Sequence, residues 1–411
     1  MSFDVAIVGA GAAGLATAIF TRRAGRSTAV ALLDGAARPG AKILVSGGSR
    51  CNVTNVAVTD RDFCGGRRSI IRRVLRGFPV ADTVAFFHAI GVDLHEEANG
   101  KLFANRARDV LEHLLGEAAA VGATLLPGRR VLDVRRADEG FRIVTAQGDV
   151  HARAVVLATG GRALPKSGSD GAGLAIAERL GHTIVPTTPA LAPLLLADDD
   201  PVHRELSGVS QDVELALWVD GAVGVRVTGA LLWTHFGVSG PAALDISRHW
   251  LRAQLNGRAV AMTASFCPGR RFEQIDAEWI ARAAARPTST ALSALGTLVP
   301  AAVAGALMRR LTIHESLTLA HLSKEHRHVL THALVEWPLP VIGSRGYTHA
   351  EATAGGIALT EIDPATMESR VCPGLYLVGE MLDVDGRLGG FNFQWAWSSG
   401  FVAGRGLGRP G

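Results

Sequence analysis

The chain has 411 residues, of which 48% are hydrophobic and 19% are charged, and its formal net charge at pH 7 is +4. This composition excludes a disordered chain and predicts a globular protein with a sizeable core and two or three domains. The four cysteines, Cys51, Cys64, Cys267 and Cys372, include no CxxC pair, which disfavours a disulfide framework and a metal site. An apolar strand begins at residue 3, so no signal peptide is expected and the predicted location is cytoplasmic.

The first 34 residues predict a dinucleotide site. An apolar run, Val5–Val8, predicts a buried parallel strand, and the GxGxxG spacing and an alanine-rich helix follow it. In this pattern Gly9 allows a tight turn, Gly11 lets the backbone approach a pyrophosphate, and Gly14 lets helix and strand pack closely. The helix N-terminus offers free N–H groups to the phosphates. A second strand ends at Asp34, where a carboxylate meets ribose hydroxyls.

The segment "GGSRCNVTN" at residues 47–55 follows this unit and is predicted to wrap the cofactor. Arg50 is a candidate partner for a phosphate or a cofactor carbonyl, and Asn52 and Asn55 are expected to fix the turn. Cys51 has two interpretations. It is either a general acid, with the adjacent arginine lowering the pKa of its thiol, or a small buried residue that packs in a tight loop.

The segment "RRSIIRRVLRGF" at residues 67–78 predicts an amphipathic helix. Three arginines lie four apart on one face: Arg68, Arg72 and Arg76. The opposite face is apolar: Ile71, Val74, Leu75 and Phe78. The basic face is either a solvated surface or a phosphate-binding face for RNA. Only four of the 42 basic residues in the chain are lysines, which reflects either a GC-rich genome or phosphate recognition.

The middle of the chain has a different pattern. Residues 213–235 show strand-like runs broken by "DG" and "TG" turns, and residues 273–336 read as helices. The uncharged stretch 291–308 contains Pro300 and predicts buried helices and no membrane span. In "THFGVSGP", His235 is a candidate proton donor or acceptor, or a hydrogen-bonded core histidine. A histidine pair four apart, at 328 and 332, lacks a third ligand, so no metal is predicted.

The C-terminal part predicts that the nucleotide is FAD. "VVLATGG" at 155–161 is another buried strand, and residues 374–407 read as a strand, an acidic glycine-rich loop and a helix. The N-terminus of that helix can face the flavin ring and stabilise its negative charge on reduction. A glycine-rich loop that only closes the sheet is the alternative. Glu380 or Asp383 is expected to bind the ribityl hydroxyls, and Asn392 and Gln394 are candidates for the pyrimidine edge.

Five stretches resemble the bacterial flavoproteins of the HI0933-like class, which are often labelled NAD(P)/FAD-dependent or aminoacetone-oxidase-like. They are "GAGAAGLATA", "GAKILVSGGSRCNVTN", "TGALLWTHFGVSGPAALDIS", "TAGGIALTEIDPATMESR" and "GLYLVGEMLDVDGRLGGFNFQWAWSSG". The chain departs from that class in three places. Ser49 stands where glycine is usual, Asp34 where glutamate is common, and Phe391 where tyrosine is common.

The resemblance implies an α/β fold with a discontinuous Rossmann-like FAD-binding domain at 1–186 and 345–411. An inserted domain at 187–344 is expected to be β-barrel-like over 187–268 and helical over 269–344. Since no second GxGxxG follows a predicted strand and opens a helix, NAD(P)H is expected to dock only transiently as an electron donor. In chain order the expected cofactor contacts are Gly9, Gly11, Ala12, Ala13, Gly14, Asp34, Lys42, Ser46, Gly47, Gly48, Arg50, Cys51, Asn52, Thr159, Gly160, Gly379, Glu380, Asp383, Gly389, Gly390, Phe391 and Asn392.

The leading functional hypothesis is an FAD-dependent oxidoreductase that reduces an activated C=C bond by hydride transfer from flavin N5, with Cys51 and His235 as candidate catalytic residues. The expected substrate is a uracil of ribosomal or transfer RNA, which would give dihydrouridine, or a small unsaturated ketone or steroid-like acid. One alternative is an oxidase of a small amine such as an aminoketone, which would be reoxidised rapidly by oxygen. Another is a flavin-binding redox protein without catalytic activity.

Overall fold

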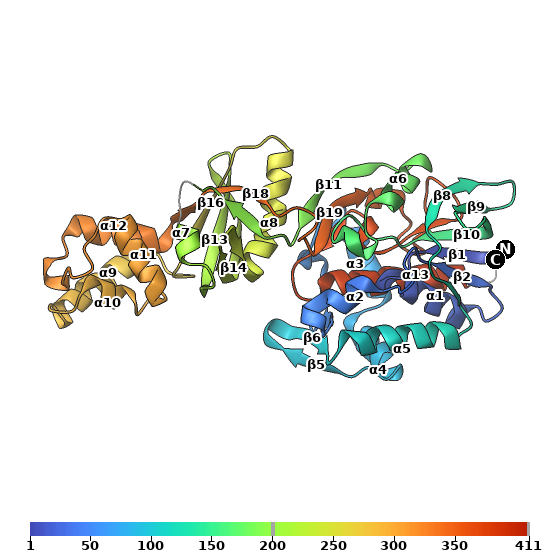
Figure 1. Ribbon diagram of the computed structural model, residues 1–411, viewed down its shortest axis with the longest axis horizontal. Coiled ribbons are helices and arrows are strands. Elements are labelled where there is room, and N and C mark those ends of the chain that lie inside the picture. The colour runs from blue at the N-terminus through green and yellow to red at the C-terminus, as the bar shows by residue number, and fades with distance from the viewer. Residues whose placement is uncertain (199–201, 409–411) are drawn as a thin grey trace. The chain divides into compact units, whose positions relative to one another are not determined.

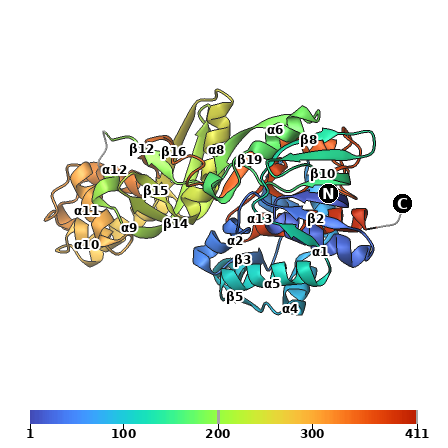
Figure 2. The same ribbon diagram turned by 45° about the vertical axis from the view of Figure 1, so that its right-hand side comes forward.

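The computed structural model describes residues 1–198 and 202–408, and the chain divides into two compact units (Figures 1 and 2). The first unit is Met1–Thr188 with Glu351–Gly411, and the second is Pro189–Ala350. The ranges expected from the sequence also include 199–201 and 409–411, which lie outside the described residues. The chain therefore enters the second unit once and returns to the first.

The first unit contains seven helices and the larger share of the strands among the described residues. Its helices are α1 (Ala12–Ala24), α2 (Ala41–Val45), α3 (Arg68–Gly77), α4 (Val80–Ala89), α5 (Ala107–Ala120), α6 (Ala172–Arg179) and α13 (Phe391–Leu407). Its strands are β1 (Ser2–Val8), β2 (Val30–Leu33), β3 (Asn52–Asn55), β4 (Phe63–Gly65), β5 (Leu94–Glu97), β6 (Lys101–Ala104), β7 (Thr124–Leu126), β8 (Val131–Arg136), β9 (Phe141–Thr145), β10 (Val150–Leu157), β19 (Ala352–Ile357), β20 (Leu375–Leu377) and β21 (Val384–Gly386). Strand β11 (Ile184–Ala190) pairs with β19 and leads into the second unit.

A seven-stranded sheet forms the centre of the first unit. Its order is β7-β2-β1-β10-β9-β8, with β20 beside β10. Strands β7, β2, β1, β10 and β20 run parallel, and β1, β2 and β10 end in continuous runs of buried apolar residues, as expected for strands covered on both faces. The α/β Rossmann-like class predicted from the sequence is confirmed.

The parallel strands bring their carboxyl ends to one edge of this sheet. The N–H of Gly9 donates to the Leu33 carbonyl (2.7 Å), and the N–H of Ala158 donates to the Val8 carbonyl (2.8 Å). The N–H of Val378 donates to the Leu157 carbonyl at 3.2 Å. Loops from four distant parts of the sequence therefore begin side by side, which is where ligands bind in open parallel sheets.

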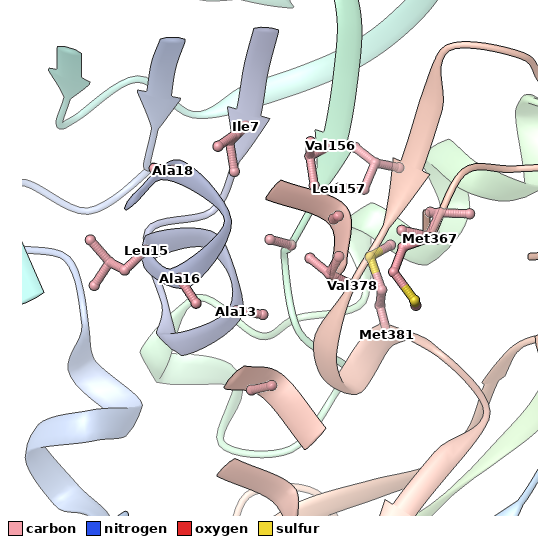
Figure 3. Close-up of a cluster of buried hydrophobic side chains, with 14 of the residues drawn as sticks. Ile7, Ala13, Leu15, Ala16, Ala18, Val156, Leu157, Met367, Val378 and Met381 are labelled. Carbon is pink, nitrogen blue, oxygen red and sulfur yellow. The ribbon is translucent and has the colours of Figure 1, made fainter. Parts of the chain in front are cut away.

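Helices α1 and α13 pack directly against each other and lie side by side in both views (Figures 1 and 2). A Cβ atom at Gly400 would lie only 2.7 Å from the Ala13 carbonyl oxygen, so glycine permits the approach. Figure 3 shows core residues from four elements around α1: Ile7 of β1, Leu15 of α1, Val156 of β10 and Met381 in the turn after β20. All four of these side chains are fully buried. The last helix of the chain is thus anchored to the first.

The second unit combines one sheet with a group of helices. Its strands are β12 (Leu194–Leu196), β13 (Ser210–Val219), β14 (Ala222–Thr234), β15 (Gly237–Ser239), β16 (Val260–Ser265), β17 (Trp337–Leu339) and β18 (Val341–Ser344). Its helices are α7 (Val202–Glu205), α8 (Gly240–Leu255), α9 (Phe272–Ala285), α10 (Ala291–Leu295), α11 (Ala301–Arg310) and α12 (Lys324–Val335). Helices α9–α12 gather beside the sheet (Figure 1).

The sheet of the second unit has the order β17-β16-β13-β14-β15-β12-β18. Its two end strands, β17 and β18, are separated only by Pro340, so the sheet must curve. A closed barrel is not shown, because the ladders of the described residues leave β17 and β18 at the two ends. The "DG" turn at Asp220–Gly221 joins β13 to β14, and both residues have positive φ, as a tight hairpin requires.

The break expected at "TG" is wrong, because Thr228 and Gly229 lie inside β14. A Cβ atom at Gly229 would lie 3.6 Å from the backbone nitrogen of Ala242, so this glycine marks the close approach of α8 to the strand. The uncharged stretch 291–308 contains α10, which ends at Leu295, and most of α11, which begins after Pro300. Within the described part of the chain, no helix has the length and apolar character needed to cross a membrane.

Candidate flavin site

The glycine turn after β1 has the tight geometry that the sequence predicts. Gly9 has φ +105°, and a Cβ atom there would lie 2.5 Å from the Ala158 carbonyl oxygen. A Cβ atom at Gly14 would lie 1.8 Å from the Gly9 carbonyl oxygen, so no larger residue fits between α1 and the turn. By contrast, nothing lies within 4 Å of a Cβ atom placed at Gly11. The turn is thus packed on its protein side and open on the side that would face a ligand.

The N-terminus of α1 is suited to hold an anion. Gly11 is its N-cap and provides no side-chain hydrogen bond, and no acidic residue occupies the first turn, where Ala12 and Ala13 lie. The free N–H groups and the positive end of the helix dipole therefore point to the open side of the turn. These residues fit the pyrophosphate of a dinucleotide.

Asp34 lies beside this turn, directly after β2. Its Oδ2 accepts the N–H of Ala10 (2.8 Å) and its Oδ1 accepts the N–H of Ala36 (2.8 Å). These two bonds fix the carboxylate at the carboxyl edge of the sheet, and each oxygen keeps further acceptor capacity. The position fits a ribose hydroxyl, so the turn and the acid together fit the nucleotide half of FAD.

The loop around Cys51 has a strained backbone. Gly47 and Gly48 have positive φ, and so do Ser49 (+70°) and Cys51 (+67°), although neither of these has the freedom of glycine. Left-handed non-glycine residues are costly and persist only where the surroundings hold them. The position at which HI0933-like proteins usually have glycine is therefore left-handed here even with serine.

Arg50 is held by the β5–β6 hairpin. Its Nη1 forms an ion pair with Glu97, and its guanidinium lies 4.6 Å from the centre of the Phe103 ring. Neither partner was foreseen from the sequence. The guanidinium already has a carboxylate partner, so a phosphate would have to compete with Glu97 for it.

Cys51 is fully buried, and burial raises the pKa of its thiol to about 11. A hydrogen bond with the Ser46 side chain lowers the pKa by a smaller amount. The expectation that Arg50 lowers this pKa is therefore wrong, because removal from water dominates the shift and Arg50 is paired with Glu97. The packing interpretation agrees with both the burial and the direction of the pKa shift.

Two asparagines join this loop to the start of α13. Asn55 donates from Nδ2 to the carbonyls of Asn99 (3.1 Å) and Gly389 (3.2 Å). In the amide orientation that satisfies its neighbours, Asn52 accepts the N–H of Gly390 (3.0 Å) and donates to the Thr54 carbonyl (2.8 Å). The asparagines therefore fix two loops to each other and not only their own turn.

A polar chain links α2, β19 and the turn after β20. Lys42 forms an ion pair with Glu380 through Oε2, and the other oxygen of Glu380 accepts the hydroxyl of Thr353 (2.9 Å). The Thr353 oxygen in turn accepts the N–H groups of Arg162 (2.8 Å) and Ala163 (3.1 Å). Two residues expected to contact the cofactor thus pair with each other, which places them together at the carboxyl edge of the sheet.

The two amides at the start of α13 are occupied within the protein. Asn392 accepts the N–H of Gly386 (2.8 Å) and donates to its carbonyl (3.0 Å). Gln394 donates to the Phe78 carbonyl (2.9 Å) and accepts the Thr54 hydroxyl (2.6 Å). Both side chains therefore organise the helix start, as do the Gly389 carbonyl and the Gly390 N–H, which bind Asn55 and Asn52.

The remaining predicted contacts lie on the same unit. Thr159 and Gly160 directly follow β10, and Gly379 is held by a bond from its N–H to Ser399 (3.0 Å). Asp383 lies just before β21, where its carbonyl accepts the N–H of Gly66 (2.7 Å). Phe391 is fully buried, so it contributes packing at the start of α13.

His235 belongs to the second unit, in the turn between β14 and β15. Its side chain is exposed and meets Phe236 edge to face, with the ring centres 5.1 Å apart. The alternative of a buried core histidine is therefore wrong. Within the described residues, no group of three or more histidine, cysteine or acidic side chains is arranged to hold a metal ion.

The family model of the HI0933-like protein Rossmann domain matches residues 3–406. This chain belongs to the HI0933-like family. HI0933-like proteins are FAD-dependent oxidoreductases, which agrees with the nucleotide cradle built by Gly9, Gly11, Gly14 and Asp34.

Two relatives of this HI0933-like protein have named activities. The chain is 32% identical over 406 residues to the ribosomal RNA dihydrouridine synthase of Escherichia coli, covering 98% of both chains. It is 31% identical over 404 residues to the 3-dehydro-bile acid delta(4,6)-reductase of Clostridium scindens, again covering 98% of both. Among solved structures, E. coli quinol fumarate reductase is similar in fold, with a TM-score of 0.50, 16% identity, and coverage of 98% of this chain and 69% of that one.

Three residues of the site were missed by the sequence reasoning. Thr353 is fully buried and carries the bond that orients Glu380, and Glu97 and Phe103 hold Arg50. The "TAGG" stretch that contains Thr353 was noticed only as part of the family resemblance. The sequence signal for Thr353 is a short polar residue inside a glycine-rich strand that is buried. Such a hydroxyl needs a hydrogen-bond partner, which here is Glu380.

Proposed function

We propose that this protein reduces a C=C bond conjugated with a carbonyl group, and that its substrate is a uracil in ribosomal or transfer RNA, which becomes dihydrouridine. The observation that carries the proposal is the 32% sequence identity, over 98% of both chains, with a ribosomal RNA dihydrouridine synthase. The second named relative is a reductase of an unsaturated bile acid. The two substrates share one chemical feature, a C=C bond next to a carbonyl.

FAD, when bound and reduced, supplies a hydride from its N5 atom. The turn at Gly9–Gly14 and the N-terminus of α1 would hold the pyrophosphate, and Asp34 would hold the adenosine ribose. The pair of Lys42 and Glu380 orders the carboxyl edge of the sheet for the ribityl chain. The N-terminus of α13, which begins after Gly390, would favour negative charge on the flavin ring.

Reduction of a conjugated C=C bond needs a proton as well as a hydride. Cys51 is poorly suited to give it, because its thiol is fully buried and its pKa is raised to about 11. We assign the proton-donor role to His235, because its imidazole is exposed and histidine is the side chain that most often transfers protons in enzymes. Cys51 is then a packing residue of the loop that surrounds the cofactor.

The electron donor we propose is NAD(P)H, which binds transiently. The GxGxxG at Gly9–Gly14 is the one that follows a strand and opens a helix in the sequence pattern, and we assign it to FAD. A nicotinamide donor would then reduce the flavin and leave before RNA binds. Reduction of the bound flavin by NADH or NADPH in stopped-flow absorbance measures this step directly.

A second candidate substrate is an unsaturated steroid-like acid, and the Clostridium relative favours it. It requires the same hydride and proton transfers, so it leaves the roles of the residues unchanged. These relatives give no comparable support for an amine oxidase. Because the chain belongs to a family of enzymes, the hypothesis of a flavin-binding redox protein without catalytic activity is not kept.

The test is mass spectrometry of dihydrouridine in ribosomal and transfer RNA from a deletion strain and its parent. We expect loss at one position, restored by the wild-type gene but not by Gly11→Trp. Purified protein with NAD(P)H should restore it in vitro on RNA from the deletion strain. Unchanged dihydrouridine with rapid reduction of a 3-oxo-4-ene steroid acid would establish the second candidate instead.

A further inference from the structure

We propose that the outward face of α3, together with the hollow beside it, is the surface on which this protein binds RNA. Its phosphate-binding groups are Arg68, Arg73 and Arg76. This inference rests on the proposed function and deepens it, since it assigns a place on the chain to the nucleic-acid substrate.

The arginines of α3 are free to bind an anion. Arg68, Arg73 and Arg76 are exposed, and within the part of the chain that the structure describes they form no ion pair. Arg72 is different, because it donates to both oxygens of Asp60, at 2.8 and 3.0 Å. This bidentate pair engages both oxygens of Asp60 and lowers the pKa of that carboxyl, to which the charge of Arg68 adds a smaller lowering effect.

Exposed arginines elsewhere on the chain commonly have an acidic partner. Examples on the strands are Arg142 with Asp149 and Arg226 with Glu214 (2.6 Å). Genome composition explains why arginine is frequent. It does not explain why a single helix carries three arginines that have no acidic partner in the described residues. Unpaired like charges on a single helix repel one another, so a bound polyanion would relieve a cost that the free protein carries.

A hollow of about 280 Å³ opens beside these arginines. It is lined by Val58, Thr59, Asp60, Arg72, Leu75, Arg76, Pro79, Val80 and Gln394. Since Asp60 and Gln394 are already engaged in hydrogen bonds, the lining offers a ligand apolar side chains, such as Leu75 and Val80, next to the cationic Arg72 and Arg76. This combination suits a nucleotide, whose base stacks on apolar surface while its phosphate meets arginine.

The hollow is connected to the cofactor edge through α13. Gln394 lines the hollow and lies four residues after Gly390, about 6 Å along the helix axis. The Phe78 carbonyl at the end of α3 accepts bonds from Gln394 (2.9 Å) and Ser398 (2.8 Å) of α13. RNA held on α3 would therefore lie near the helix that begins at the proposed flavin edge.

Three features favour RNA over an anionic membrane surface. The apolar face of α3, with Ile71, Val74 and Leu75, is already buried in the core, so it cannot insert into lipid. No large hydrophobic side chain is exposed between residues 57 and 80. All the basic residues of α3 are arginines, whose planar forks match phosphate bidentately.

The test compares two triple variants with equal change in charge. The first is Arg68→Gln, Arg73→Gln and Arg76→Gln, which leaves the Arg72–Asp60 pair intact. The matched control is Arg26→Gln, Arg108→Gln and Arg286→Gln, since these arginines are also exposed and form no ion pair in the described residues. Affinity for a fluorescent stem-loop RNA with uridines in the loop is measured between 50 and 300 mM salt, on FAD-loaded protein.

We expect the α3 variant to lose about tenfold or more in affinity at 100 mM salt, and its slope of log K against log salt to fall by about 2, because each lost contact to single-stranded RNA removes about 0.7. The control should change little. An unchanged slope in the α3 variant, or an equal loss in the control, overturns the inference. Wild-type binding to phosphatidylglycerol vesicles without binding to RNA also overturns it, in favour of a membrane.

Dihydrouridine formation by the same proteins separates this inference from the proposed function. If the wild type reduces uracil in RNA and the α3 variant binds and reduces it equally well, the function stands and the surface is wrong. If RNA binding depends on α3 but the wild type reduces no uracil, the surface stands and the proposed substrate chemistry is wrong.

Discussion

The side chain of Asn55 donates a hydrogen bond to the carbonyl of Gly389, 334 positions later in the chain, at 3.2 Å. This bond joins the end of β3 to the glycines before α13, and the contact between Asn52, at the start of β3, and Gly390 reinforces it. Both loops belong to the proposed cofactor edge. The shape of that edge therefore depends on contacts between the two ends of the chain.

Asn55→Ala should destabilise the protein and weaken FAD binding. Asn55 is buried, and the variant leaves the carbonyls of Asn99 and Gly389 without a donor, which costs about 1–3 kcal/mol of unfolding free energy. Urea unfolding and the FAD dissociation constant measure both effects. Asn105→Ala changes an exposed asparagine and serves as the control. Equal stability of the two variants would contradict the structural role of Asn55.

Gly11→Trp should fold normally and purify without FAD. A Cβ atom at Gly11 meets nothing within 4 Å, so the protein can hold the larger residue, but the indole would occupy the phosphate position. Gly116→Trp is the matched control, because Gly116 is also open and lies on α5. Flavin absorbance at 450 nm and circular dichroism give the two readouts. A folded Gly11→Trp protein with full flavin content would show that the cofactor lies elsewhere.

Cys51 should make the protein less stable at high pH. Burial raises the pKa of the folded thiol from 9.0 to about 11, so the folded protein holds the proton more tightly than the unfolded chain. The contribution of this pKa difference to the free energy of unfolding is fully present below about pH 9 and is lost as the pH rises to about 11. Urea unfolding at pH 8 and 10.5 should show a smaller decline for Cys51→Ala than for the wild type. An identical decline would exclude the shifted thiol.

Lys42 and Glu380 should be energetically coupled. They form an ion pair that is only partly exposed, with 24% and 18% of their side chains accessible, so its energy should exceed that of a typical surface pair. A double-mutant cycle with Lys42→Met and Glu380→Gln should give a coupling of about 1 kcal/mol or more in unfolding free energy. Additive effects of the two substitutions would mean that the pair is not formed in solution.

His235→Asn should slow the reduction of substrate by about 10²–10⁴-fold without changing FAD content. The imidazole is exposed and packs edge to face on Phe236, so the fold should tolerate the change. His326→Asn alters another exposed histidine of the second unit and is the control. Normal turnover by His235→Asn would assign the proton to another group or to water.

Local patterns in the sequence determined the nucleotide fold. The spacing of Gly9, Gly11 and Gly14 between an apolar strand and a helix depends on neighbours within a few residues, so it can be recognised without the tertiary structure. The two faces of α3 were predictable for the same reason, since helical periodicity alone separates Ile71 and Val74 from the arginines.

Only the tertiary structure decided which polar groups meet. Arg50 pairs with Glu97 and Asn55 with Gly389 because the chain brings distant segments together, and no local pattern encodes those distances. The direction of the Cys51 pKa shift depends on burial by the whole domain, which outweighs the charge of its sequence neighbour. The glycine turn of the site can thus be predicted from the sequence, because the shape of a backbone turn depends on neighbouring residues. The side-chain hydrogen bonds of the site cannot, because buried polar groups find their partners in distant segments of the chain.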